Sequence, residues 1–235
     1  MFYIKISDIV IAIDNRYPYV QHLCRDHIVP ECAADLMIAV TDEEIEWEQR
    51  NDFSFSPDYC ESLAIYRKIC QRLLAYDAFL MHAAVIAMDG KAYAFAASSG
   101  TGKTTHIRQW KALFGKRVEV INGDKPIIRK MNGCFYACGT PWCGKEHMGG
   151  SSFYPLQAIC FIEQGSENQI RPLQQGKVIG RLFRQLLLPE DQSALDRYMG
   201  LVEQLLTAAN FFLLTCKPEP EAAQRAYEGM VEGRC

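Results

Sequence analysis

Two apolar runs flank the dipeptide Asp89-Gly90, and the second leads straight into a loop of small, hydroxyl-bearing residues. The runs read MHAAVIAM and KAYAFAA, and the loop reads SSGTGKTT over residues 98–105. Asp-Gly is favoured in two-residue hairpin turns because both positions accept positive φ. The sequence therefore predicts an antiparallel hairpin whose second strand ends at the loop. An amphipathic helix over residues 103–114 should follow and stop at Gly115.

The same hairpin signal returns at Asn132-Gly133, between the runs PIIRKM and CFYACG. A doubly wound fold alternates strand and helix, whereas this chain has hairpins both before and after the glycine-rich loop. We therefore predict an α/β fold in which residues 78–235 form a core around a mixed sheet. Its further elements are expected as strands at 118–122, 156–163 and 211–216, helices at 178–188 and 194–209, and a short terminal helix.

Residues 1–77 are predicted to form a smaller α+β portion that covers the core or docks a substrate. Residues 1–55 are expected to form short strands and loops. FYIKI alternates like a strand, and DLMIAVT resembles a buried strand. An amphipathic helix is expected to begin at Pro57, with Ser56 as its N-cap. The acidic stretch TDEEIEWEQ, residues 41–49, is interpreted as a solvated edge or a turn.

The loop fits the Walker A pattern G-x-x-x-x-G-K-[ST], except that Ala97 stands at the first glycine. Gly100 and Gly102 allow the backbone to curl so that successive N–H groups point at phosphate oxygens. Lys103 would reach the β- and γ-phosphates of ATP, and Thr104 would ligate Mg²⁺. The alternative is an ordinary glycine turn before a helix. The predicted phosphate-binding residues are Ser99, Gly100, Thr101, Gly102, Lys103, Thr104 and Thr105.

Phosphoryl transfer also needs a carboxylate, and Asp124 is the first acid after the predicted helix. It follows the strand VEVIN, where a Mg²⁺ ligand or a base for a hydroxyl would be expected. Asp124 could instead be a turn residue of GDKP. His82 stands 21 residues before Lys103, at the start of a strand. For this histidine an active-site role and that of a satisfied core residue both stay open.

The segment CGTPWCGKEH, residues 138–147, is unusual for a loop because it holds Trp142 between glycines and Lys145 close by. Trp142 offers a flat apolar face and Lys145 a positive charge, so both are candidate substrate contacts. The alternative is a structural turn whose tryptophan is inserted into the core.

Composition excludes several classes of protein. The formal net charge is −3, whereas general binders of nucleic acid or membrane surfaces present basic faces. No apolar stretch is long enough to span a bilayer, and no secretory signal is visible. The ten cysteines include no CxxC pair, so reduced thiols in a cytoplasmic protein are expected.

The stretches LMHAAVIAMDGKAYAFAASSGTGKTTHIRQW, INGDKPIIR and GTPWCGKE resemble the HPr kinase/phosphorylase-like P-loop kinases, which share a fold with phosphoenolpyruvate carboxykinase. The resemblance covers about residues 78–217 and is stronger to the stand-alone HPr-kinase-like serine kinases of bacteria. It implies transfer of the γ-phosphoryl of Mg·ATP to a hydroxyl, such as a serine of a peptide or a small molecule. It also implies a homo-oligomer as one arrangement. In the active site it implies Lys103 on phosphate, Thr104 on the metal, and Asp124 as a carboxylate beside His82.

Two departures from that family bear on the reaction: Ala97, and Gly123 where members carry the first of two acids. Asp124 must then act alone, or share the work with another acid such as Glu163. No counterpart of the loop that grips HPr is visible, so HPr is not the expected acceptor. The alternative function is an ATP-binding regulatory or assembly module without phosphotransfer. A carboxykinase-like lyase is disfavoured by the short chain.

Overall fold

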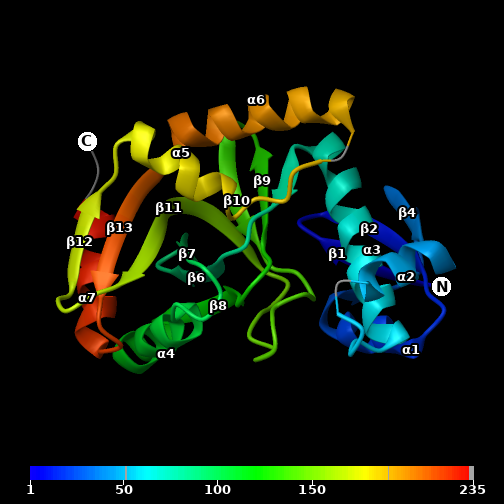
Figure 1. The fold of residues 1–235 in the computed structure, drawn as a ribbon, viewed down its shortest axis with the longest axis horizontal. Coiled ribbons are helices and arrows are strands. Elements are labelled where there is room, and N and C mark those ends of the chain that lie inside the picture. The colour runs from blue at the N-terminus through cyan, green and yellow to red at the C-terminus, as the bar shows by residue number, and fades with distance from the viewer. Residues whose placement is uncertain (51, 190, 233–235) are drawn as a thin grey trace.

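The computed structural model describes residues 1–50, 52–189 and 191–232. Within these residues the strands form two sheets. A four-stranded sheet lies near the N-terminus, and a nine-stranded sheet is formed by the strands that follow. The N-terminal elements lie to one side of the larger sheet, which has helices on both faces (Figure 1). The fold is α/β with a mixed sheet, as the hairpin signals predict.

The small sheet has the strand order β3-β1-β2-β4 and is covered by three helices. Its first two strands are joined by a tight turn at Ser7-Asp8, where both residues have positive φ. The strand expected at FYIKI is confirmed as β1, whereas the turn that follows it was not predicted, because no glycine signals it. The elements are β1 (Phe2–Ile6), β2 (Ile9–Asp14), α1 (Pro18–Leu23), β3 (Ile28–Val29), β4 (Leu36–Ala39), α2 (Asp42–Gln49) and α3 (Pro57–Leu73).

The acidic stretch 41–49 forms helix α2 and is neither a solvated edge nor a turn. A capping box explains the difference: Glu44 N donates to Thr41 Oγ1 at 3.3 Å, and Thr41 N donates to the Glu44 carboxylate at 2.8 Å. Glu48 is buried and accepts a hydrogen bond from Arg67 of α3 at 2.7 Å. Helix α3 begins at Pro57 as predicted, although Ser56 makes no capping hydrogen bond through its side chain.

The large sheet combines parallel and antiparallel pairs. Strands β7, β11 and β13 are parallel neighbours, and β6, β8, β9, β10, β5 and β12 join them in antiparallel pairs. The strands are β5 (Ala78–Leu80), β6 (Ala84–Met88), β7 (Lys91–Ala96), β8 (Val118–Asn122), β9 (Ile127–Met131), β10 (Cys134–Cys138), β11 (Phe153–Gln164), β12 (Gln169–Pro172) and β13 (Asn210–Cys216).

Both predicted hairpins are confirmed. Met88 pairs with Lys91 across Asp89-Gly90, and Met131 pairs with Cys134 across Asn132-Gly133. All four turn residues have positive φ, as a two-residue primed turn requires. The first hairpin places the end of β7 directly before the glycine-rich loop.

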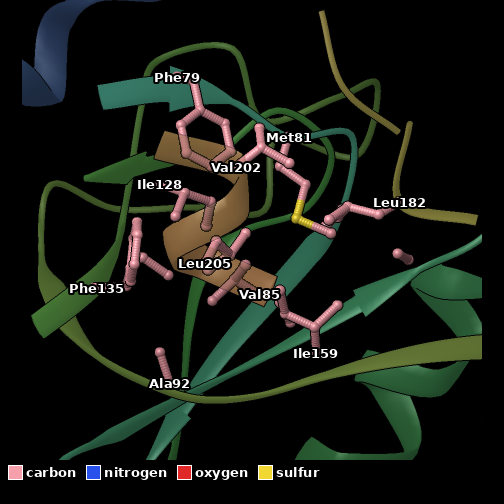
Figure 2. Packing of buried hydrophobic residues seen from close by; sticks show 14 of the residues in the cluster. Phe79, Met81, Val85, Ala92, Ile128, Phe135, Ile159, Leu182, Val202 and Leu205 are labelled. Atoms are coloured by element: carbon pink, nitrogen blue, oxygen red, sulfur yellow. The ribbon is translucent and has the colours of Figure 1, made fainter. Parts of the chain in front are cut away.

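Four helices cover the two faces of the large sheet (Figure 1). Helices α4 (Lys103–Phe114) and α7 (Pro220–Glu232) pack on one face, where Trp110 is fully buried. Helices α5 (Gln175–Phe183) and α6 (Gln192–Ala208) pack on the other. Figure 2 shows Val202 and Leu205 of α6 directed at strand residues such as Ile128 and Val85.

Helix α5 ends at Phe183, so the predicted helix over residues 178–188 is too long. Arg184 and Gln185 form a turn after it, and Leu186 forms an isolated bridge with Met81. Tertiary pairing with residues 81–82 thus overrides the helical propensity of the leucine-rich segment. As a result of this pairing, the end of α5 lies beside the segment that leads into β6.

A single apolar cluster joins the small sheet and α3 to one side of the large sheet. It includes Ile4, Ile11 and Ile69, together with Ile127 and Trp142. Among the helices of the described residues, none is both long and apolar enough to cross a bilayer.

Candidate functional site

The glycine-rich loop lies between the end of β7 and the start of α4. Gly100 and Gly102 have φ of +78° and +118°, values that residues other than glycine rarely adopt. Thr101 N donates to Ser98 O at 3.2 Å and closes the turn. Ala97 is not among the residues with positive φ, so the first position of the motif does not need glycine here.

Lys103 is buried at the N-terminus of α4, with 8% of its surface exposed. Its Nζ donates to Ala97 O at 2.8 Å, so the ammonium group lies over the loop. Burial lowers the pKa of Lys103, and the nearby Asp124 carboxylate acts in the opposite direction. The helix has no side-chain cap, which leaves its first-turn N–H groups available to an anion.

His82 and Asp124 are in contact, with His82 Nε2 3.0 Å from Asp124 Oδ1. Asp124 follows β8 and is held by an Asx-type turn. The side chain of Asn122 accepts hydrogen bonds from Asp124 N at 2.8 Å and from Lys125 N at 2.7 Å. Asn122 is fully buried and donates to Thr140 O and Oγ1. The carboxylate therefore has a fixed position.

Asp124 is an ionised carboxylate near neutral pH. Burial raises its pKa, but the hydrogen bond from His82 and the charges of Lys125 and Lys103 together lower it below the ordinary value. Because Lys103 and Asp124 influence each other's pKa, the loop and the end of β8 belong to one electrostatic environment.

Two chain segments, one after α5 and one after β8, position His82. Its backbone N donates to Gln185 O at 2.6 Å, beyond the end of α5. Ala83 N donates to Asp124 O at 3.1 Å, which ties the start of β6 to the end of β8. His82 therefore contacts the Asp124 carboxylate. It is not a core histidine whose ring makes its hydrogen bonds to other groups.

A cleft of about 500 Å³ lies between the glycine-rich loop and the end of α5. Sequence reasoning missed three of its residues, Arg181, Arg184 and Gln185. Their only sequence signal is the i, i+3 spacing of the two arginines, which places them on one helical face. Arg181 forms an ion pair with Glu163, the acid considered as a partner for Asp124. The Gln185 side-chain oxygen is buried without a hydrogen-bond partner, and Arg184 is exposed.

The loop over residues 139–150 leaves no room for a side chain at position 123. A Cβ built at Gly123 would lie 2.8 Å from Cys143 O and 3.1 Å from Met148 O. A Cβ at Gly144, which has φ of +85°, would lie 3.0 Å from Asp124 Cβ. The loop therefore packs against the end of β8 so closely that only one carboxylate fits.

Trp142 lies in the interior and does not line the cleft. It is 5% exposed, its ring stacks on Tyr66 at a centroid distance of 4.2 Å, and its Nε1 donates to Ser62 O at 3.0 Å. This is the core-inserted alternative that the sequence left open. Lys145 is exposed on the same loop.

Within the described residues no group of three or more His, Cys, Asp or Glu side chains could hold a metal ion. Thr104, half-buried in the first turn of α4, and Asp124 are the two oxygen donors that the sequence assigned to Mg²⁺. Such a pair fits Mg²⁺, which keeps several waters and takes substrate phosphates as further ligands.

Two comparisons with known proteins bear on this chain, and a third, with curated proteins, finds no match. A solved structure of the HPr(Ser) kinase/phosphatase from Coxiella burnetii aligns with 66% of this chain and 99% of its own. Its TM-score is 0.38 and its identity 7%, a distant similarity that does not bear on activity. The profile of the SynChlorMet cassette protein ScmC matches residues 60–184. That match takes in His82, the glycine-rich loop and Asp124 and spans more than half of the chain, which therefore belongs to the ScmC family.

Proposed function

We propose that this protein is a kinase that binds Mg·ATP at the loop 98–105 and transfers the γ-phosphoryl group to a hydroxyl. The observation that carries the proposal is the contact of His82 with Asp124 at the end of β8, in a chain whose glycine-rich loop leads to a buried lysine at the N-terminus of α4. Lys103 and Asp124 influence each other's pKa, and His82 Nε2 lies 3.0 Å from Asp124 Oδ1. Such an arrangement suits phosphoryl transfer, which depends on positioning and on charge stabilisation.

Phosphate binding would use groups that are already in place. The first-turn N–H groups of α4 and the loop amides would hold the phosphate oxygens. Lys103 would exchange its bond to Ala97 O for phosphate oxygens. Mg²⁺, held by Thr104 and Asp124, would neutralise phosphate charge when bound.

Asp124 would also orient the acceptor hydroxyl and take its proton as the acceptor oxygen bonds to the γ-phosphorus. The bond from that phosphorus to the β–γ bridging oxygen breaks, and ADP leaves. Because the pKa of Asp124 is lowered, its role is orientation and late proton acceptance rather than strong base catalysis. His82 positions the carboxylate through their hydrogen bond.

The acceptor would enter the cleft that Arg181, Arg184 and Gln185 line, since Gln185 O contacts the backbone N of His82. We propose a serine of a peptide or a hydroxylated small molecule as the acceptor. Residues 1–77 would support the loop beside Asp124, because their apolar cluster includes Trp142.

The test is formation of ADP and of a phosphorylated acceptor from γ-labelled ATP, Mg²⁺ and a pool of metabolites and peptides. Lys103→Met should abolish both ATP binding and transfer. Lys145→Met removes an exposed lysine outside the loop and should leave ATP binding unchanged. Retention of both ATP binding and transfer in Lys103→Met would overturn the proposal.

The second candidate is a nucleotide-binding module without transfer activity. The observation that favours it is the close packing at Gly123, which leaves Asp124 without a second acid. Stable ATP binding by the wild type, without ADP formation on any acceptor, would support the module over the kinase.

A further inference from the structure

A second pocket, of about 400 Å³, lies on the other side of the glycine-rich loop. One wall is the first two turns of α4, with Thr105, His106 and Gln109. The opposite wall comes from the ends of β11 and β13. The residues there are Ile162, Gln164, Gly165, Cys216, Lys217 and Pro218.

Sheet topology places this pocket where a nucleotide would extend beyond its phosphates. Strands β7, β11 and β13 are adjacent and parallel, so the loops after their carboxyl ends lie side by side. Ligands of α/β sheets bind in the crevice outside these ends. The Gln164 side chain donates to Thr101 O at 3.3 Å and fixes the glycine-rich loop against the end of β11.

Two polar side chains in the helical wall are more than nine-tenths buried. His106 is 2% exposed and Gln109 is 8% exposed. Trp110 Nε1 donates to His106 Nε2 at 2.9 Å, which leaves the proton of a neutral imidazole on Nδ1. Burial lowers the pKa of His106 to about 4, against a smaller opposite effect of the Gln109 amide, so the ring is neutral.

His106 Nδ1 is buried and, although Gln109 lies beside it, has no hydrogen-bond partner of acceptable geometry within the described chain. A buried donor without a partner costs free energy that a ligand acceptor would recover. The helical wall thus holds an amide, Gln109, and a buried donor that makes no hydrogen bond, His106 Nδ1.

The two pockets differ in their charged residues. The first contains Glu163, Arg181 and Arg184 and adjoins His82 through Gln185, which suits the acceptor and the reacting phosphate. The second contains no carboxylate, and its charged lining residue is Lys217, which is exposed. Its apolar groups are Ile162, half-buried Cys216 and Pro218.

We propose that the second pocket binds the base of the nucleoside triphosphate, with Gln109 and His106 meeting the polar edge of the base. Ile162 and Pro218 would contact the faces of the ring system. This inference rests on the proposed nucleotide binding at the loop and adds the subsite that distinguishes a nucleoside triphosphate from inorganic polyphosphate.

The experiment compares ATP with inorganic tripolyphosphate by isothermal titration calorimetry, both with Mg²⁺. The wild type should bind ATP at least about tenfold more tightly than tripolyphosphate, because the base adds buried contacts. Gln109→Leu should lose most of that difference and keep its affinity for tripolyphosphate. Gln71→Leu makes the same change on the exposed surface of α3 and should bind both probes like the wild type.

A second measurement needs no substitution. Cys216 lines the pocket and is half-buried, whereas Cys32 and Cys134 are exposed elsewhere. At an ATP concentration ten times its Kd, alkylation of Cys216 should slow about tenfold, because about one molecule in eleven stays free. Cys32 and Cys134 should react at unchanged rates, and tripolyphosphate should not protect Cys216.

Equal wild-type affinity for the two probes, or equal loss of both in Gln109→Leu, would overturn the base subsite and leave the phosphate loop intact. Alkylation of Cys216 at an unchanged rate in saturating ATP would also overturn the base subsite. Absence of binding by either probe would overturn the proposed function as well.

Discussion

His82 Nε2 lies 3.0 Å from Asp124 Oδ1 although 42 residues separate the two in the chain. If Asp124 orients the acceptor, Asp124→Asn should lower kcat by about 10²-fold or more, the range typical of a general base. His82→Ala should lower kcat less, because it removes only a positioning contact. In single-turnover assays of both variants, an unchanged rate for Asp124→Asn would contradict the assignment.

The pH profile separates the two roles of this pair. His82 and two lysines hold the pKa of Asp124 below its ordinary value, so the carboxylate stays ionised well into the acid range. Loss of His82 should raise the pKa of Asp124. The acid limb of kcat should therefore move to higher pH in His82→Ala, whereas a purely structural effect would lower the whole profile without moving it.

Arg184 is exposed in the cleft, in contrast to Arg181, which is paired with Glu163. Arg184→Ala should weaken acceptor binding or the transfer step and leave the Kd for ATP within about twofold, a change of less than about 0.5 kcal/mol. Arg108→Ala removes an arginine whose partner is Glu146, outside the cleft, and serves as the control. Steady-state kinetics with an acceptor found in the labelled-ATP assay, together with ATP calorimetry, would measure both.

Gly123 has no room for a side chain beside Cys143 O and Met148 O. Gly123→Ala should lower the free energy of unfolding by about 1–3 kcal/mol, the usual cost of overpacking. Gly176→Ala is the matched control, since a Cβ there meets no atom within 4 Å and the site is helical. Urea unfolding would compare the free energies of unfolding of the two variants. Equal values would show that the loop beside Gly123 shifts to make room for the added methyl group.

His106 should make the protein less stable in acid. Its pKa is lowered to about 4 in the folded chain, so the unfolded chain binds the extra proton first as pH falls below about 6.5. The contribution is present above pH 6.5 and is lost toward pH 4, by up to about 3 kcal/mol. In His106→Asn the free energy of unfolding, measured at several pH values, should change less steeply with pH between these limits. An unchanged slope would show that His106 is not the cause of the pH dependence.

Local signals predicted much of the core. The Asp-Gly and Asn-Gly turns fix both hairpins because φ at these positions is a property of the residues themselves. The glycine-rich loop was predictable for the same reason, since Gly100 and Gly102 have the positive φ that the motif demands. The Ser7-Asp8 turn was missed because its residues carry no such local signal.

The rest of the site depends on tertiary pairing. Helix α5 ends at Phe183 because Leu186 pairs with Met81, whereas a leucine-rich sequence alone favours a longer helix. The position of Gln185 beside His82 follows from that pairing and could not be predicted from spacing. Trp142 gave an ambiguous signal, because a tryptophan in a glycine-flanked loop suits either a substrate or the core, and stacking on Tyr66 decides for the core.

Strand β11 pairs with β10 over residues 153–155, and its residues 158–161 pair with both β7 and β13. Rotation of one half of the sheet against the other would have to break the hydrogen bonds of this strand. Adaptation to an incoming molecule is consequently confined to short connections such as 97–102 and 139–152. Divergence toward other ligands would then proceed by changes in those connections, while the paired strands are kept.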